Sequence, residues 1–245
     1  MNTAELPELP SFTGLYNVRD LGGRRTNDGR MTKYRKYVRS AAADALSETA
    51  KDALYHYGIR LIVDLRYESE ILKTPNPLAG YRDIQYETVD LLNDFVPQLG
   101  PLYQDMGDLY IAWLEHSRAP IARVFRLFAD HPDDGVLFHC SVGKDRTGLI
   151  AALLLGLAGC APGDLIADYA ESYHRLAPSP LYREAPPEFK PYLLSEPSYM
   201  EKTLRHLDHT YGGIAAYLRS IGLSAPTLAA ITEGFFTPPC SRFGH

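Results

Sequence analysis

Residues 136–148 read VLFHCSVGKDRTG and join one apolar run to a second, which continues to Leu157. The first run is typical of a buried strand and the second of a buried helix. The loop between them ends at a helix N-terminus, where unpaired backbone N–H groups and the positive end of the helix dipole face an anion. Gly143 allows the tight curvature that turns successive amides inward. This segment therefore predicts a strand–loop–helix unit that binds an anion of the size of phosphate or sulfate.

Cys140 and Arg146 give this loop its predicted chemistry. The helix N-terminus and the guanidinium both favour the thiolate form of Cys140, which can attack phosphorus and form a phosphocysteine intermediate. Arg146 is expected to hold two equatorial oxygens with its planar fork, and Thr147 to donate a hydrogen bond to the thiolate. The chemistry requires no metal and no cofactor. The other residues expected to bind the phosphate are Ser141, Val142, Gly143 and Lys144.

The leaving alkoxide or phenolate needs a proton, and three aspartates are candidates for the general acid. Asp64 ends an apolar strand predicted from Ile59, at the edge where parallel sheets bind their ligands. Asp145 lies in the phosphate loop itself, and Asp90 ends the next predicted strand. Position in the predicted sheet favours Asp64 first, Asp145 second and Asp90 third.

Three further residues near the loop have two interpretations each. Arg66 is expected either to contact substrate or to form a surface ion pair with Glu68 or Glu70. Lys144 either recognises a second phosphate or is a solvated loop charge. His139 precedes the turn, so it is expected to support the loop through hydrogen bonds rather than to act as an acid.

Outward from the loop, strands alternate with helices, which predicts an α/β fold with a mostly parallel sheet flanked by helices. Ser47 is a plausible N-cap and Gly58 a left-handed terminator for the helix between them. Pro120 is expected to break or kink a long helix, and Asp164 to cap a later one. The expected strands cover 59–65, 84–89 and 135–139. The expected helices cover 109–129, 147–157, 164–175, 198–209, 214–220 and 225–234.

Composition limits the class of protein. The chain has 245 residues, of which 45% are hydrophobic, and a formal net charge of -5. One domain over 12–236 with tails at 1–11 and 237–245 is expected, without binding to nucleic acid or stable insertion into a membrane. Three widely spaced cysteines fit neither a disulfide framework nor a zinc cluster. These features favour the cytoplasm, and secretion by a non-classical route stays open.

The loop also resembles a known signature. Cys-x5-Arg followed by Thr-Gly is similar to the motif of protein tyrosine phosphatases and dual-specificity phosphatases, and Lys144-Asp145 narrows the similarity to the bacterial atypical tyrosine/serine phosphatases. Supporting segments are NVRDLGG at 17–23, DLR at 64–66 and YGG at 211–213. The resemblance spans about 12–234. It implies a phosphatase-type fold, a helical lid over about 161–210, and activity on phosphoinositides in some members.

The main hypothesis is a metal-independent hydrolase of phosphotyrosine in proteins, with phosphoserine/threonine or phosphoinositides as further possible substrates. Two other classes compete with it. A non-catalytic module would capture a phosphorylated partner with the same loop. A rhodanese-like sulfurtransferase would also present a cysteine at a helix start, although Arg146-Thr147-Gly148 fits phosphate chemistry better.

Overall fold

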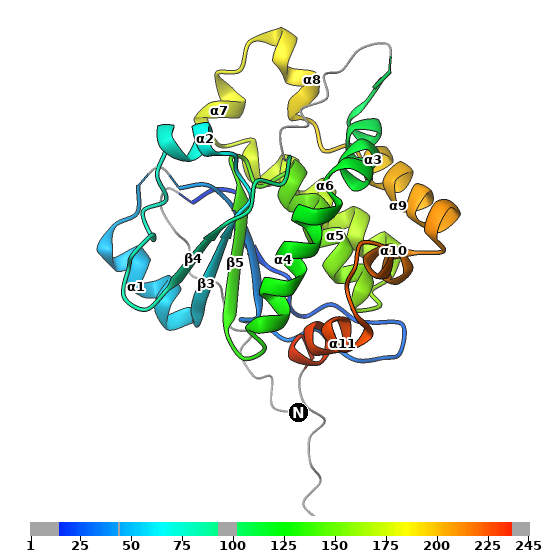
Figure 1. Cartoon of the computed structure of the whole chain (residues 1–245). Helices are drawn as coiled ribbons and strands as arrows, with labels where there is room; N and C mark the ends of the chain where they lie inside the picture. The colour runs from blue at the N-terminus through cyan, green and yellow to red at the C-terminus, as the bar shows by residue number, and fades with distance from the viewer. Residues whose placement is uncertain (1–14, 44, 93–101, 237–245) are drawn as a thin grey trace, which may run out of the picture.

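The sheet runs through the centre of the molecule (Figure 1). The computed structural model describes residues 15–43, 45–92 and 102–236. The strand order is β1-β2-β5-β3-β4, in which β1 is antiparallel to β2 and the other pairs are parallel. The strands are β1 Arg19–Asp20, β2 Tyr37–Ala41, β3 Ile59–Asp64, β4 Gln85–Thr88 and β5 Gly135–Cys140. The predicted α/β fold with a mostly parallel sheet is confirmed.

Helices cover both faces of this sheet, with α1 on one face and α4, α5, α10 and α11 on the other (Figure 1). A short 3-10 helix covers Pro187–Phe189. The α-helices are α1 Glu48–Tyr57, α2 Glu68–Lys73, α3 Met106–His116, α4 Arg118–Asp130, α5 Asp145–Leu157, α6 Pro162–Leu176, α7 Pro180–Arg183, α8 Lys190–Leu193, α9 Pro197–Tyr211, α10 Ile214–Ser220 and α11 Ala225–Gly234. None of the helices in the described ranges has the length and apolar character that crossing a bilayer requires.

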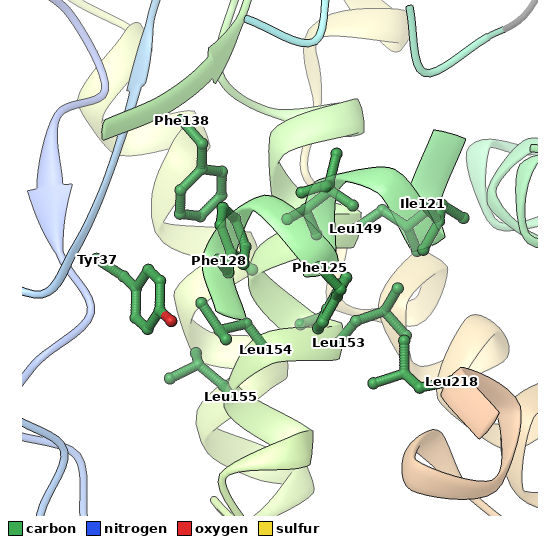
Figure 2. Close-up of a cluster of buried hydrophobic side chains, with 14 of the residues drawn as sticks. Tyr37, Ile121, Phe125, Phe128, Phe138, Leu149, Leu153, Leu154, Leu155 and Leu218 are labelled. Carbon is green, nitrogen blue, oxygen red and sulfur yellow. The ribbon is translucent and has the colours of Figure 1, made fainter. Parts of the chain in front are cut away.

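Side chains of the central strand β5 point alternately to the two faces of the sheet and contribute to two hydrophobic cores. Val136 and Phe138 of β5 face the larger core, whereas Leu137 between them faces the smaller core against α1. Figure 2 shows Phe138 above aromatic rings of α4 and leucines of α5, so α5 is buried on most of its surface. This burial explains why its sequence is apolar on nearly every side. The helix that follows the phosphate loop is therefore fixed by packing.

The parallel strands bring the candidate chemistry to one edge of the sheet. In the β2–β5 pair Ala41 lies opposite Cys140, and in the β3–β5 pair Asp64 lies opposite His139. These are the carboxyl ends of three neighbouring strands, where ligands of open α/β sheets bind. The topology therefore places Cys140 at the centre of this edge.

Helix boundaries agree with the sequence where capping decides them. The Ser47 side chain accepts a hydrogen bond from the Ala50 N–H, and Gly58 ends α1 with a φ of 109°. The expected break at Pro120 is wrong: Ser117 separates α3 from α4, and the proline lies in the first turn of α4, where it costs no hydrogen bond. Asp164 is not an N-cap, because α6 already begins at Pro162.

The region predicted as a helical lid, 161–210, has two parts. Leu165 of α6 and Met200 of α9 belong to the larger core. Residues 177–196 between these helices carry α7, the 3-10 helix and α8, and they lie at the same edge of the sheet as α2 (Figure 1). We call them the 177–196 segment. The predicted tails, and residues 12–14 of the predicted domain, lie outside the described residues.

Candidate active site

The loop between β5 and α5 closes around the sulfur of Cys140. The Gly143 N–H donates to Cys140 Sγ at 3.3 Å, and Cys140 is 3% exposed. Gly143 has a φ of 70°, and a Cβ there would lie 2.2 Å from the Ser40 carbonyl oxygen, so only glycine fits. α5 begins at Asp145, two residues before the predicted Thr147, so Arg146 lies in its first turn.

Two side chains from other parts of the chain hold the loop carbonyls on its outer side. Asn17 Nδ2 donates to the Gly143 carbonyl at 2.8 Å and to the Val142 carbonyl at 3.2 Å. Arg39 Nη2 donates to the Gly143 carbonyl at 2.7 Å and to the Lys144 carbonyl at 3.3 Å. In a trans peptide the C=O and the N–H point in opposite directions. Holding the Val142 carbonyl outward therefore turns the following N–H, that of Gly143, inward toward the sulfur.

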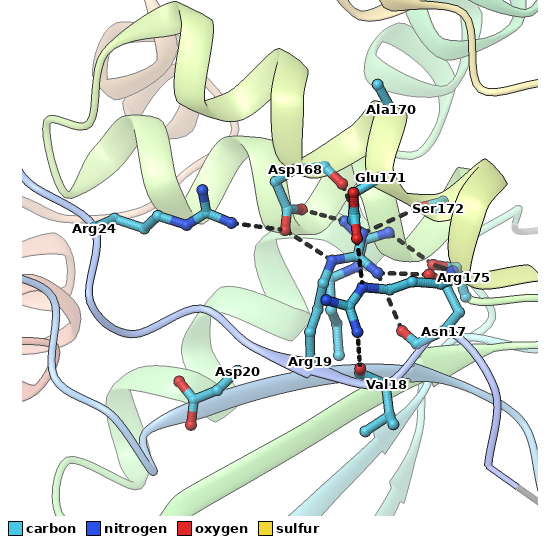
Figure 3. Close-up of polar contacts among 12 residues, drawn as sticks. Asn17, Val18, Arg19, Asp20, Arg24, Asp168, Ala170, Glu171, Ser172 and Arg175 are labelled. Carbon is cyan, nitrogen blue, oxygen red and sulfur yellow. Dashed lines mark hydrogen bonds and ion pairs between the residues drawn. The ribbon is translucent and has the colours of Figure 1, made fainter. Parts of the chain in front are cut away.

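A buried carboxylate holds both supports in place. Asp168 of α6 accepts from Arg19 Nε at 2.9 Å and pairs with Arg39 through its other oxygen, and Arg19 also donates to the Asn17 side chain. Burial alone would raise the pKa of Asp168, but the two guanidinium groups hold it well below its usual range. Figure 3 shows Asp168 facing Arg19, with Asp20 pointing away from the cluster.

The sequence predicted only part of the cluster formed by Asn17, Arg19, Arg39 and Asp168. The supporting motif at 17–23 contains Asn17 and Arg19, whereas Arg39 and Asp168 belong to none of the predicted site residues. A usable signal was present. Arg39 is the one charged residue of β2, and Asp168 occupies a buried position of an amphipathic helix, where a lone charge would be costly unless paired.

Arg146 forms a bidentate ion pair with Glu70 of α2. Nη1 lies 2.6 Å and Nη2 2.7 Å from the two carboxylate oxygens, and the Ser141 hydroxyl donates to the same carboxylate. Burial alone would lower the pKa of Arg146, but Glu70 and the neighbouring Cys140 raise it above its ordinary value. The guanidinium therefore stays charged.

The ion pair with Glu70 leaves part of the guanidinium available. Of its five N–H donors, Glu70 takes one from each terminal nitrogen, and the Leu65 carbonyl lies 3.4 Å from Nη1. No described residue accepts from the second N–H on Nη2 or from the Nε–H, which lie side by side, the pairing that binds two oxygens of a phosphate. Glu70 was considered in the sequence only as a partner of Arg66, so its pairing with Arg146 is a correction.

Asp64, the first choice for general acid, is enclosed and fully buried. Its carboxylate accepts from Arg66 at 2.7 and 2.9 Å and from the Tyr86 hydroxyl at 2.7 Å. Burial would raise the pKa of Asp64, but the hydrogen bond from Arg66 and the other partners lower it. An enclosed carboxylate that holds its charge is unsuited to donating a proton, so the geometry argues against this assignment.

The interpretations of Arg66 change for the same reason. It is 2% exposed and also donates to the Thr74 carbonyl at 2.9 Å, so it is neither a surface ion-pair partner nor paired with a residue of α2. Arg66 still lines a hollow of about 230 Å³ together with Glu70, Lys73 and Ser141. Contact between Arg66 and substrate stays a prediction.

Asp145 is the candidate acid that lies in the loop itself. Its side chain is 24% exposed, accepts a hydrogen bond from the Tyr110 hydroxyl and lies 3.3 Å from Lys144 Nζ. Tyr110 is held in turn by the Tyr169 hydroxyl at 2.7 Å. Asp90 accepts from the Leu92 N–H in the turn after β4. Asp145 is the one of the three aspartates that lies in the phosphate loop, and its role as general acid stays a prediction.

Two predicted loop contacts differ in the structure. The hydroxyl of Thr147 is buried and has no hydrogen-bond partner among the described residues, so the expected bond to Cys140 is not formed. Lys144 is 1% exposed and donates to the carbonyls of Tyr192 and Leu194. A solvated loop charge is thereby excluded for Lys144, and contact with a second phosphate is disfavoured.

His139 supports the loop, as the sequence predicts. The Leu78 N–H donates to Asn76 Oδ1 at 2.9 Å, which turns the Asn76 amide nitrogen toward His139 Nε2, 2.8 Å away. Nε2 therefore accepts, and Nδ1 carries the proton and donates to the Cys140 carbonyl at 3.1 Å. Burial lowers the pKa of His139 below 6.5, and the Asp64 carboxylate offsets this only partly. The imidazole is neutral at pH 7.

This neutral, buried imidazole makes stability dependent on pH. Because the pKa of His139 is lower in the folded chain than in the unfolded chain, its stabilising contribution is complete above about pH 6.5 and is lost as the pH falls toward the folded-state value. We expect the free energy of unfolding, measured with urea from about pH 7.5 to about pH 5.5, to fall less steeply in His139→Gln than in the wild type. The exposed His209→Gln is the control and should keep the wild-type slope. Equal slopes for His139→Gln and wild type would contradict this assignment.

A hollow of about 440 Å³ opens beside the loop. Its walls come from the end of β2, the loop, and the start of the 177–196 segment. None of the side chains that line it carries a charge. They are Tyr16, Ala41, Ala42, Ala45, Ser141, Val142, Leu176, Ser179, Pro180 and Leu181.

An anion-binding loop with a thiol at its base and a guanidinium at its rim, at the carboxyl edge of a parallel sheet, places the chain in the class of protein tyrosine phosphatases. Sequence comparison agrees. The model of the tyrosine phosphatase family matches residues 10–237, and the chain belongs to this family. The predicted resemblance is thereby confirmed.

The relatives carry consistent names. A tyrosine-protein phosphatase of Nostoc commune is 34% identical over 205 residues, which is 77% of this chain and 70% of the relative. The triple specificity protein phosphatase PtpB of Mycobacterium tuberculosis is 25% identical, over 90% of this chain and 95% of that protein. Among solved structures, the core catalytic domain of the PP-IP phosphatase SIW14 from S. cerevisiae, in complex with citrate, has a TM-score of 0.41 at 13% identity, covering 82% of this chain and 96% of that one. That structural likeness is too distant to support further conclusions.

Proposed function

We propose that this phosphatase hydrolyses phosphotyrosine in proteins through a phosphocysteine at Cys140, without a metal. The thiolate attacks phosphorus, the S–P bond forms, and the P–O bond to tyrosine breaks. Asp145 gives its proton to the leaving phenolate oxygen. Water then attacks phosphorus, returns a proton to Asp145 and releases phosphate and the thiolate. The observation that carries the proposal is the Gly143 N–H directed at Cys140 Sγ, together with the two Arg146 N–H groups from which no described residue accepts.

The loop can stabilise the charge that builds up on the transferring phosphoryl group. Inward N–H groups and the Arg146 guanidinium are fixed before substrate arrives, by Asn17, Arg39 and Glu70. Donors that are already in position cost no rearrangement when the transition state forms, so their contribution is large. A compartment that keeps thiols reduced, such as the cytoplasm, suits this nucleophile.

The uncharged hollow beside the loop supports an aromatic leaving group. Val142, Leu181 and Tyr16 offer apolar surface next to the loop, as a phenyl ring requires. An inositol ring with several phosphates would need cationic side chains there, and the lining residues include none. Phosphotyrosine is therefore favoured over phosphoserine, which is too short to fill the hollow, and over phosphoinositides.

A panel of three substrates tests this proposal. We expect kcat/KM for a phosphotyrosine peptide to exceed that for the matching phosphoserine peptide by at least about tenfold, the scale of one buried apolar contact. A soluble phosphoinositide should be poorer still, and turnover should persist in EDTA. Binding of the phosphopeptide without turnover would favour a non-catalytic module, and sulfur transfer from thiosulfate would favour a rhodanese-like enzyme. Either result would refute the hydrolase assignment.

A further inference from the structure

The side chain of Lys144 is fully engaged inside the protein. Its Nζ donates to the Tyr192 carbonyl at 2.6 Å and to the Leu194 carbonyl at 2.7 Å, and lies 3.3 Å from an Asp145 oxygen. An ammonium group has three N–H donors and no acceptor. All three are thus accounted for, and two of them hold the backbone of the 177–196 segment against the phosphate loop.

The end of the 177–196 segment is also fixed to α6. The Ser195 hydroxyl donates to the Ala170 carbonyl at 3.0 Å and accepts from the Tyr173 N–H at 2.8 Å. The segment has a first arm, 177–183, which contains α7, and a second arm, 190–196, which contains α8. The two arms are joined, because the Tyr182 hydroxyl donates to the Leu193 carbonyl at 2.6 Å. A force on the second arm is therefore transmitted to the first arm.

The first arm forms one wall of the uncharged hollow. Ser179, Pro180 and Leu181 line it on one side, and Val142 of the loop lines it on the other. The distance between these two walls sets the thickness of the group that can enter. It depends on where the first arm lies. That arm starts from α6, where the Ser179 N–H donates to the Leu176 carbonyl at 2.8 Å, and its far end is held through Tyr182 and Lys144.

We propose that Lys144 is a positioning residue that anchors the 177–196 segment and thereby sets the width of the substrate hollow, so that it determines specificity without touching the substrate. The role in specificity rests on the proposed phosphatase function, whereas the anchoring itself does not. Charge-assisted hydrogen bonds are stronger than neutral ones, which suits a lysine for holding backbone carbonyls in a protein interior.

Limited trypsin digestion tests the anchoring independently of catalysis. Within the segment, trypsin can cut after the exposed Arg183, whereas Lys190 is followed by Pro191 and resists cleavage. Lys144→Met should release the segment and speed cleavage after Arg183 by about tenfold or more, since cleavage follows the population of the open form. Lys190→Met removes an exposed charge from the same segment and is the matched control; it should be cut at the wild-type rate.

Kinetics test the consequence for specificity. In Lys144→Met, the ratio of kcat/KM for a bulky naphthyl phosphate to that for p-nitrophenyl phosphate should rise by about fivefold or more, because the wall no longer excludes the larger ring. Tyr182→Phe, which loses only the bond between the arms, should shift the ratio in the same direction by a smaller factor. It also serves if Lys144→Met does not fold.

The outcomes separate the two proposals. Cleavage of Lys144→Met at the wild-type rate would overturn the anchoring. The same holds if Lys144→Met loses affinity for a doubly phosphorylated peptide while digestion is unchanged, since Lys144 would then bind a second phosphate. A wild type that hydrolyses no aryl phosphate would end the proposed function, and the digestion rates would still decide whether Lys144 is the anchor.

Discussion

Cys140→Ser is expected to lower kcat for p-nitrophenyl phosphate by at least about 10⁴-fold, the scale seen when a nucleophile is removed from a preformed site. A serine hydroxyl in the same place stays protonated and cannot form the S–P bond. The loop itself should survive, because its shape depends on Gly143, Asn17 and Arg39 rather than on the sulfur. Isothermal titration should therefore still detect binding of phosphotyrosine to Cys140→Ser.

The second buried cysteine provides the control for this experiment. Cys160 lies beyond the end of α5, and burial and the nearby Asp164 raise the pKa of its thiol to about 11. It is therefore a thiol at neutral pH and is remote from the loop, so Cys160→Ser should keep wild-type turnover. Substantial residual activity in Cys140→Ser would exclude Cys140 as the nucleophile.

Arg146→Lys is expected to lower kcat/KM for the same substrate by about 10³-fold or more, the range attributed to an arginine that stabilises a transferring phosphoryl group. Lysine keeps the positive charge but has no planar fork, so it cannot hold Glu70 and two phosphate oxygens at once. We expect the loss in both kcat and phosphate affinity, measured by inhibition with inorganic phosphate.

Glu70→Gln separates positioning from direct contact with phosphate. The amide keeps one acceptor for Arg146 and loses the charge, so the guanidinium should stay near its place but be held less firmly. We expect a loss about tenfold smaller than that of Arg146→Lys. If Arg146→Lys retained wild-type kinetics, the guanidinium would have no part in the reaction, whatever Glu70→Gln does.

Some features could be predicted because the residues that decide them are adjacent in the chain. The strand, the loop, Gly143 and the helix start occupy 136–148, so residue types and spacing define the anion site. Ser47 and Gly58 likewise decide the ends of α1 by local hydrogen bonds. The 3.6-residue pattern of 109–129 found helical structure there but not its division at Ser117, because both halves continue the same apolar periodicity.

Pairings between distant residues escaped prediction. Arg39 with Asp168, Arg146 with Glu70 and Lys144 with Tyr192 join elements that the sequence separates by tens of residues. Asp64 was correctly placed at the carboxyl edge of the sheet, but its side chain turns to Arg66 instead of the loop. The position of a residue along a strand determines the face and the end of the sheet at which it lies. The direction of a charged side chain depends instead on which oppositely charged group lies within reach.

The order of residues along one short loop was enough to predict an anion site with a nucleophile and a clamp, since Cys140, Gly143, Arg146 and the start of the helix lie within a few residues of one another. Only the tertiary structure decided which carboxylate meets which cation: Glu70 holds the clamp, Asp168 holds the supports of the loop, and the carbonyls near Tyr192 take up Lys144. The physical reason is that buried charges must be paired, and packing of the helices on the sheet determines which partners come within reach.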